Sequence, residues 1–305
     1  MPDKSYNAKV LLFGEYTIIH GANALAIPVT QFSGKWAFAN DSQATILNKE
    51  LIAFADYVEQ LYKNELVFYD LDLKTFRQEI GKGLYFQSTI PHGYGAGSSG
   101  ALCAAVYERF SQYKIGVIEN IDLYDLRIKL ALLEKYFHGS SSGIDPLISL
   151  INKPVLINQS NNSIVRLPAS GHSNRAVFLL DTGIKRKTEP LVRLFLEKYK
   201  NDFFVTICKE RLTNFNENAI QCFLQAQWQE LFNTVHQISR IQLEHFNEMI
   251  PEGFLSVWKE GLERELYRLK LCGAGGGGFI LGFTNDLEKT IAAFPNNRIT
   301  SIYRF

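Results

Sequence analysis

Three glycine-rich segments constrain this chain more than any other feature. They read PHGYGAGSS at residues 91–99, HGSSSGID at residues 138–145 and GAGGGG at residues 273–278. Glycine adopts backbone conformations that other residues avoid, and it lets the main chain approach a ligand closely. A fourth segment, residues 9–21, adds a lysine, a glutamate and a histidine at the end of an expected strand. Together they predict a phosphate cradle, a carboxylate and a cation, the groups that phosphoryl transfer requires.

The first glycine loop lies between an expected strand over residues 84–90 and an expected helix over residues 101–110. Glycines can turn backbone N–H groups inward, and the start of a helix offers unpaired N–H groups and a positive dipole end. Ser98 or Ser99 can cap the helix, and both hydroxyls could touch phosphate or a magnesium ion. The competing interpretation is a flexible turn.

The same loop also matches a motif of dinucleotide-binding proteins. Gly95–Gly100 fit GxGxxG, and Glu119 follows about twenty residues later. Against this interpretation, Pro91 and His92 separate the strand from the glycines where a tight turn is wanted. In addition, the chain from Asp122 reads as a helix and not as a continuing βαβ series.

The second loop ends in an acid, and the acid is its most informative residue. Residues 139–143 match GxSxG, which would make Ser141 a hydrolase nucleophile, but that motif follows a strand and residues 122–136 read as a helix. Asp145 directly precedes Pro146 and an apolar run, so it is expected at a helix N-terminus, where it could serve catalysis or only cap the helix. Glu134 is a second candidate oxygen ligand or an ordinary solvated helix charge.

The third loop lies between expected strands over residues 268–272 and 279–284. No helix follows it, so its own GxGxxG match does not predict a dinucleotide site. Six residues with five glycines exceed a simple hairpin loop, which favours close contact over turn formation. Lys9, in an otherwise apolar strand, is either an edge-strand lysine that reaches water or a cation beside a reacting hydroxyl. The P-loop motif GxxxxGK[ST] does not occur in the sequence.

Composition excludes several classes of protein. The 305 residues are 46% hydrophobic with a formal net charge of +1, so neither nucleic-acid nor membrane-surface binding has electrostatic support. The polar N-terminus and the lack of a long apolar run predict a cytoplasmic protein without a signal or membrane segment. The four cysteines, at positions 103, 208, 222 and 272, are widely spaced and are expected to be reduced thiols.

The order of expected elements predicts an α+β fold with two domains. Strands are expected over residues 8–13, 24–30 and 35–39, and a helix over 50–63. A polar stretch over residues 168–174 places the domain boundary near residue 170, which gives domains of residues 1–170 and 171–305. The second domain is expected to open with a strand over 175–181, to be mostly helical from 189 to 268, and to end in strands.

The four segments together resemble the GHMP kinases, and among these the mevalonate kinases. Residues 9–21, KVLLFGEYTIIHG, are similar to the first motif of the family, and residues 91–99 to its ATP-phosphate loop. Residues 138–145 are similar to the HGxxSGxD segment, and residues 270–279, KLCGAGGGGF, to the third motif. Arg186-Lys-Thr188 falls where these enzymes carry a substrate-contacting threonine. The chain differs at Tyr16, where histidine is frequent, and at Gly100, where alanine is usual.

The resemblance implies a ribosomal protein S5 domain 2-like N-terminal domain and a ferredoxin-like C-terminal domain, with ATP and substrate meeting between them. It implies phosphorylation of (R)-mevalonate to 5-phosphomevalonate in isoprenoid synthesis, by a monomer or homodimer. Another small-molecule acceptor, such as phosphomevalonate or a sugar, and a binding protein of the same fold without catalysis are the alternatives. Retention of Lys9, Glu134 and Asp145 speaks against the binding protein.

The resemblance also implies a role for each site residue. Asp145 would orient or deprotonate the substrate hydroxyl, and Lys9 would stabilise Asp145 and lower the effective pKa of that hydroxyl. Glu134 and Ser99 would hold Mg2+. His20, Thr188 and Gly275 would contact the mevalonate-like alcohol. The ATP phosphates would be wrapped by the first loop, which comprises Gly93, Tyr94, Gly95, Ala96, Gly97, Ser98 and Ser99.

Overall fold

The computed structural model describes residues 4–39, 48–63, 71–112, 122–158, 161–186 and 188–305. It divides into two compact units that each draw on separate stretches of the chain. The first comprises residues 1–9, 28–90 and 97–153, and the second comprises residues 10–27, 91–96 and 154–305. The predicted division into residues 1–170 and 171–305 stays a prediction. Strands β1 (Tyr6–Phe13) and β2 (Ala24–Phe38) contribute residues to both units.

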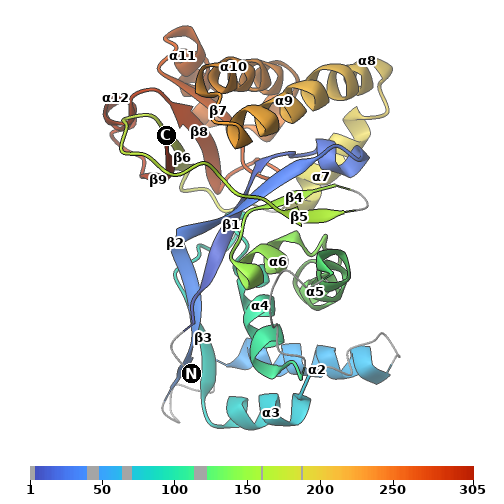
Figure 1. The fold of residues 1–305 in the computed structure, drawn as a ribbon. Helices are drawn as coiled ribbons and strands as arrows, with labels where there is room; N and C mark the ends of the chain where they lie inside the picture. Colours follow the sequence, from blue (N-terminus) through green and yellow to red (C-terminus); the bar gives the residue numbers. More distant parts are fainter. Residues whose placement is uncertain (1–3, 40–47, 64–70, 113–121, 159–160, 187) are drawn as a thin grey trace. The chain divides into compact units, whose positions relative to one another are not determined.

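In the first unit, helix α4 forms the centre of the core. Most of its length is buried, and it packs against α6, α5 and α3 (Figure 1). Strand β3 pairs antiparallel with β2, from Gly34 opposite Ser88 to Phe38 opposite Leu84. The elements of this unit are α2 (Lys49–Lys63), α3 (Leu73–Gly81), β3 (Leu84–Ser88), α4 (Ser98–Phe110), α5 (Leu123–His138) and α6 (Ile144–Ile151).

The antiparallel pairing of β3 excludes the dinucleotide-binding interpretation of Gly95–Gly100. That motif requires a parallel βαβ unit, whereas the strand before this loop runs antiparallel to its neighbour. Glu119, the acid that the interpretation needed, lies outside the described residues.

In the second unit, four strands form an antiparallel sheet in the order β7-β8-β6-β9. Numbered along the chain, this is the order 4-1-3-2 when read from β9, which is the arrangement of a ferredoxin-like domain, as expected. Strand β7 packs against α10 and α11, and Trp258 of α11 is fully buried. The strands are β6 (Ala176–Asp181), β7 (Tyr267–Leu271), β8 (Phe279–Thr284) and β9 (Ile299–Arg304).

The remainder of the second unit is mostly helical, as the sequence predicted. Its short hairpin of β4 (Val155–Ile157) and β5 (Asn162–Ile164) pairs with β2 through β4. The helices are η1 (Thr17–His20), α7 (Thr188–Lys198), α8 (Asp202–Thr206), the π-helix η3 (Ile207–Leu212), α9 (Thr213–Leu224), α10 (Trp228–His245), η4 (Asn247–Met249), η5 (Glu252–Phe254), α11 (Leu255–Glu263) and α12 (Leu287–Ala293). None of the helices in the described ranges is long and apolar enough to cross a membrane.

Candidate active site

Lys9 and Asp145 form an ion pair in the first unit. Lys9 Nζ lies 2.8 Å from Asp145 Oδ1, and the two side chains are 10% and 27% exposed. Lys9 lies in β1, an outermost strand of its sheet, but its amine pairs with Asp145 and does not reach water. Asp145 stands in the first turn of α6, whose N-cap is Gly143 without a side-chain cap. The carboxylate thus pairs with Lys9, and the interpretation of Asp145 as a simple helix cap does not hold.

The close approach of α4 to Asp145 depends on Gly100. A Cβ atom at this position would lie 2.6 Å from Asp145 Cβ and 2.7 Å from its carbonyl carbon. Such distances force a neighbouring atom to move, and here the neighbours include main chain. The departure from the alanine that is usual in the resembling family therefore has a local reason, because glycine leaves room for the acid.

Glu134 is buried beside this pair and is held by two serines. Its Oε1 accepts a hydrogen bond from Ser99 Oγ at 3.1 Å, and its Oε2 accepts one from Ser141 Oγ. The pKa of Glu134 is raised to about 7, chiefly by burial and then by the negative charge of Asp145. Hydrogen bonds from Ser141 and Ser99 and the charge of Lys9 act in the opposite direction. Glu134 is therefore not the solvated helix charge that sequence reasoning kept as an alternative.

Ser141 and His138 also belong to this cluster, and the sequence did not predict their contacts with Glu134 and Ser99. Ser141 follows a helix, and its hydroxyl is engaged with Glu134 and with the N–H of Gly143, so the nucleophile interpretation is wrong. His138 Nε2 lies 3.0 Å from Ser99 Oγ. Their spacing from Glu134 is the signal that could have indicated both, because His138 ends α5 four residues beyond Glu134 and Ser141 lies seven residues beyond it.

The first glycine loop divides between the two units. Gly97 is the N-cap of α4, and Ser98 and Ser99 form its first turn, so the N-terminal N–H groups of the helix lie where phosphate binding was predicted. In the second unit, Gly93 accepts a hydrogen bond from the N–H of Arg186 at 3.0 Å. The Tyr94 ring packs edge-on against Phe279 at 5.1 Å, and Ala96 is buried. Gly95 has the positive φ of 70° that glycine permits.

The third glycine loop is tied to its own unit by main-chain hydrogen bonds. The N–H of Gly276 donates to Met249 at 2.6 Å, and the N–H of Gly278 donates to Ile184 at 2.6 Å. The Tyr16 hydroxyl, which stands where the family frequently has histidine, donates to the carbonyl of Ala274 at 2.7 Å. The loop is thus a tightly held element, in accord with the close contact that its length indicated.

Arg186 joins the ends of two glycine loops within the second unit. Its Nη1 donates to the carbonyls of Cys272 at 2.7 Å and Gly275 at 2.9 Å, while its own N–H donates to Gly93. Sequence reasoning quoted Arg186 only as a neighbour of Thr188 and assigned it no function. Its position just before a threonine motif gave no sign of this bridging role.

The remaining predicted substrate residues lie in the second unit. His20 ends η1 and stacks on Tyr199, with ring centroids 3.7 Å apart. Thr188 is the exposed first residue of α7. Lys270 Nζ and Glu15 Oε1 form a fully buried ion pair at 2.6 Å, which sequence reasoning did not predict. Glu15 belongs to the first motif and Lys270 to the third, so this pair fixes two motif segments to each other.

Comparison with known proteins gives a consistent class. Residues 52–153 match the family described as GHMP kinases N terminal domain. With the α+β fold and the lysine–acid ion pair, this match over residues 52–153 agrees with the resemblance to small-molecule kinases of the GHMP class. A mevalonate kinase from Thermococcus onnurineus (strain NA1) is 24% identical over 311 residues, which span 93% of this chain and 90% of that protein.

Solved structures of the class share the fold. The L. major mevalonate kinase in complex with R-mevalonate aligns over 100% of this chain and 96% of its own, with a TM-score of 0.65 and 15% identity. A Streptococcus pneumoniae phosphomevalonate kinase in complex with phosphomevalonate and AMPPNP aligns over 99% of this chain and all of its own, with a TM-score of 0.62 and 19% identity. At such identities the likeness establishes the fold.

Proposed function

We propose that this chain transfers the γ-phosphoryl group of ATP to the primary hydroxyl of (R)-mevalonate and yields 5-phosphomevalonate. The observation that carries the proposal is the 2.8 Å ion pair of Lys9 and Asp145 beside the N-terminus of a glycine-capped helix. Phosphoryl transfer needs positioning and charge stabilisation more than covalent chemistry, and this arrangement supplies both. The mevalonate kinase from Thermococcus onnurineus, similar over nearly its whole length, supports this acceptor.

In this proposal Asp145 orients the acceptor hydroxyl and takes its proton as the oxygen attacks the γ-phosphorus. Lys9 holds the carboxylate in place through their ion pair, and its positive charge favours the developing alkoxide. Gly93 to Ser99 hold the phosphates of ATP through backbone N–H groups and serine hydroxyls. His20, Thr188 and Gly275 contact the acceptor.

Glu134 and Ser99 are suited to hold Mg2+. They offer one carboxylate and one hydroxyl, both hard oxygen ligands, 3.1 Å apart. No group of three or more His, Cys, Asp or Glu side chains that could hold a metal occurs in the described ranges. That fits Mg2+ in kinases, which binds few protein groups and completes its shell with phosphate and water. Bound there, it would neutralise charge on the transferring phosphates. Its positive charge would also favour the ionised form of Glu134.

Phosphomevalonate is a second candidate acceptor. It is supported by the structural similarity to the Streptococcus pneumoniae phosphomevalonate kinase, which aligns over 99% of this chain. The two acceptors differ by a phosphate, so a direct assay separates them. Release of ADP is measured with ATP and Mg2+ over mevalonate, phosphomevalonate, homoserine and galactose. We expect turnover with mevalonate at least tenfold above the others in kcat/KM. Preference for phosphomevalonate would transfer the assignment to that acceptor, and activity on none would favour a binding protein of this fold.

A further inference from the structure

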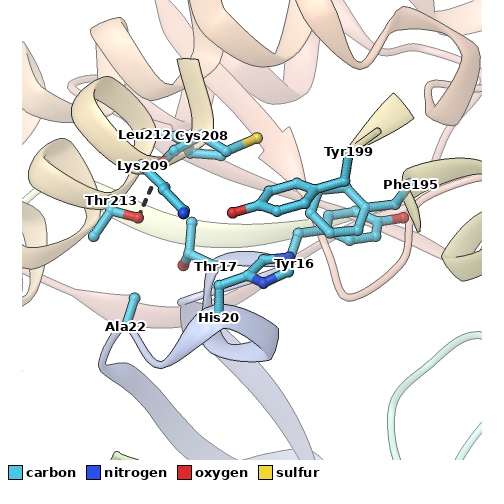
Figure 2. A pocket seen from close by; sticks show the side chains of 10 residues that line it. All are labelled: Tyr16, Thr17, His20, Ala22, Phe195, Tyr199, Cys208, Lys209, Leu212 and Thr213. Carbon is cyan, nitrogen blue, oxygen red and sulfur yellow. Dashed lines mark hydrogen bonds between the residues drawn. The ribbon is translucent and has the colours of Figure 1, made fainter. Parts of the chain in front are cut away.

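A small pocket in the second unit has no part in the proposed reaction beyond the placement of His20. Its volume is about 160 Å³, and it is walled by residues of η1, α7, the π-helix η3 and α9 (Figure 2). The lining residues that carry the inference are Thr17, His20, Tyr199, Cys208 and Lys209. Three lining residues come from η3, a π-helix, the wider helix type that is frequent at functional sites.

The pocket has preorganised aromatic walls. The His20 and Tyr199 rings stack at 3.7 Å with an angle of 7° between their planes, and Tyr16 stacks on Phe195 at 4.5 Å. Such stacked rings have little rotational freedom, so a ligand that enters finds the walls already in place.

Two hydroxyls at the pocket lack hydrogen-bond partners within the described part of the chain. They are Thr17 Oγ1 and Tyr199 Oη, both closed off from solvent. Thr17 is 4% exposed, and Figure 2 shows the Tyr199 hydroxyl directed toward the side where Lys209 and Thr17 lie. Most buried hydroxyls in proteins are paired, so these two at one cavity are available to donate hydrogen bonds to a ligand.

The charge of the pocket is positive. Lys209 makes no ion pair with any carboxylate of the described residues, and its amine faces the interior of the pocket (Figure 2). The pKa of His20 is lowered by burial and by the charge of Lys209, so this ring is neutral at physiological pH. Burial raises the pKa of the Cys208 thiol to about 12, so it adds no negative charge.

We propose that this pocket binds a small organic or inorganic anion, with Lys209 as its counter-charge and the hydroxyls of Tyr199 and Thr17 as hydrogen-bond donors. The volume equals that of about five water molecules, and it is well below the ~300 Å³ at which pockets for drug-sized ligands begin. A nucleotide is therefore too large, and a short hydroxycarboxylate or a phosphate fits. The anion is either the carboxylate end of the acceptor or a separate effector, and the site does not depend on the kinase assignment.

The test uses the full chain and the imidazole NMR signals of His20, identified by their loss in His20→Gln. Wild type is titrated with (R)-mevalonate, with inorganic phosphate and with neutral mevalonolactone. We expect at least one anion to move the His20 signals saturably and the lactone to leave them in place. Lys209→Met should weaken that binding about tenfold or more, because it removes a charge-assisted hydrogen bond. Tyr199→Phe should weaken it severalfold.

Lys259→Met is the matched control, because Lys259 is an exposed lysine of the same unit that lies outside the pocket. A KM for mevalonate that rises about tenfold in Lys209→Met, with kcat and the KM for ATP kept, assigns the anion to the acceptor. An unchanged KM with weakened anion binding assigns it to an effector. The proposal is overturned if neither anion moves the His20 signals, if the lactone moves them as the anions do, or if Lys209→Met binds like wild type.

Discussion

At the scale of single residues, the site depends on three charged groups that lie close together with little exposure to solvent. Asp145 keeps some contact with solvent and pairs with Lys9, whereas Glu134 is almost fully buried and receives only hydroxyl hydrogen bonds within the described residues. The two acids thus have different environments. The first pairs with a cation, and the pKa of the second is raised by burial.

This difference predicts a pH dependence of stability. The pKa of Glu134 is raised to about 7 in the folded protein, above its ordinary value of 4.5. Between these values the folded state binds more protons than the unfolded one, so the free energy of unfolding falls as pH rises from about 4.5 to about 7. We expect this residue to account for a fall of about 3 kcal/mol in the ligand-free protein.

To measure this contribution, the free energy of unfolding of wild type and of Glu134→Gln is determined with denaturant at pH 5 and pH 7.5. The contribution of Glu134 is the difference between the changes that the two proteins show from pH 5 to pH 7.5. Gln keeps the shape and cannot ionise, so its pH dependence should lack the fall assigned to Glu134. Identical pH dependences in the two proteins would show that the carboxyl titrates normally.

Gly100 offers a second prediction at this scale. Gly100→Ala should lower kcat about tenfold or more and reduce stability, because its Cβ would displace Asp145. In an open helical position the same change stabilises by ~1 kcal/mol. Gly81→Ala at the end of α3, where a Cβ meets nothing within 4 Å, is the matched control. Full activity in Gly100→Ala would mean that Asp145 tolerates displacement.

At the scale of elements, the sequence predicted most helices and the strands near the glycine loops. It predicted separate strands over residues 24–30 and 35–39 where β2 is continuous. In the structure the Phe86 ring packs over Gly34, and the ladder to β3 begins at that residue. It did not predict helix α3, although Asp72 is its N-cap and accepts a hydrogen bond from the N–H of Thr75. Buried residues recur in this helix at positions 76 and 80. Nine residues give too few periods for a clear pattern.

The residues of the site likewise fall into those that the sequence indicated and those that it did not. The motifs indicated Lys9, Asp145, Glu134 and Ser99, because their residue types and order were informative. They could not indicate Arg186 or the buried pair of Glu15 and Lys270, since these contacts join residues that lie 86 or more positions apart. Only the fold brings such residues together.

Arg186 provides the prediction at this scale. Arg186→Met removes two charge-assisted hydrogen bonds to carbonyls of the third loop, at Cys272 and Gly275. We expect the KM for ATP to rise about tenfold with a smaller change in kcat, because the guanidinium that lies beside Gly95 and holds the third loop is lost. Arg193→Met, which removes only an exposed pair within α7, is the control. An unchanged KM for ATP in Arg186→Met would show that the hydrogen bonds of Arg186 to the third loop do not contribute to nucleotide binding.

At the scale of the whole molecule, the predicted site residues are distributed over the two units of the chain. Lys9, Asp145 and Glu134 belong to the first, whereas residues 91–96, His20 and Thr188 belong to the second. The cytoplasmic location and the monomeric or homodimeric state stay predictions. In the proposed function, the Asp145 carboxylate serves the transfer of a phosphoryl group to mevalonate.

The most direct test measures transfer from γ-labelled ATP to (R)-mevalonate by wild type, Asp145→Asn and Lys9→Met, alongside their nucleotide affinities and melting temperatures. We predict that wild type forms 5-phosphomevalonate. Asp145→Asn should turn over ~10³-fold more slowly and Lys9→Met at least ~10²-fold more slowly, with nucleotide binding and melting temperature nearly unchanged. Transfer by Asp145→Asn at the wild-type rate, or no transfer to mevalonate by wild type, would contradict the account.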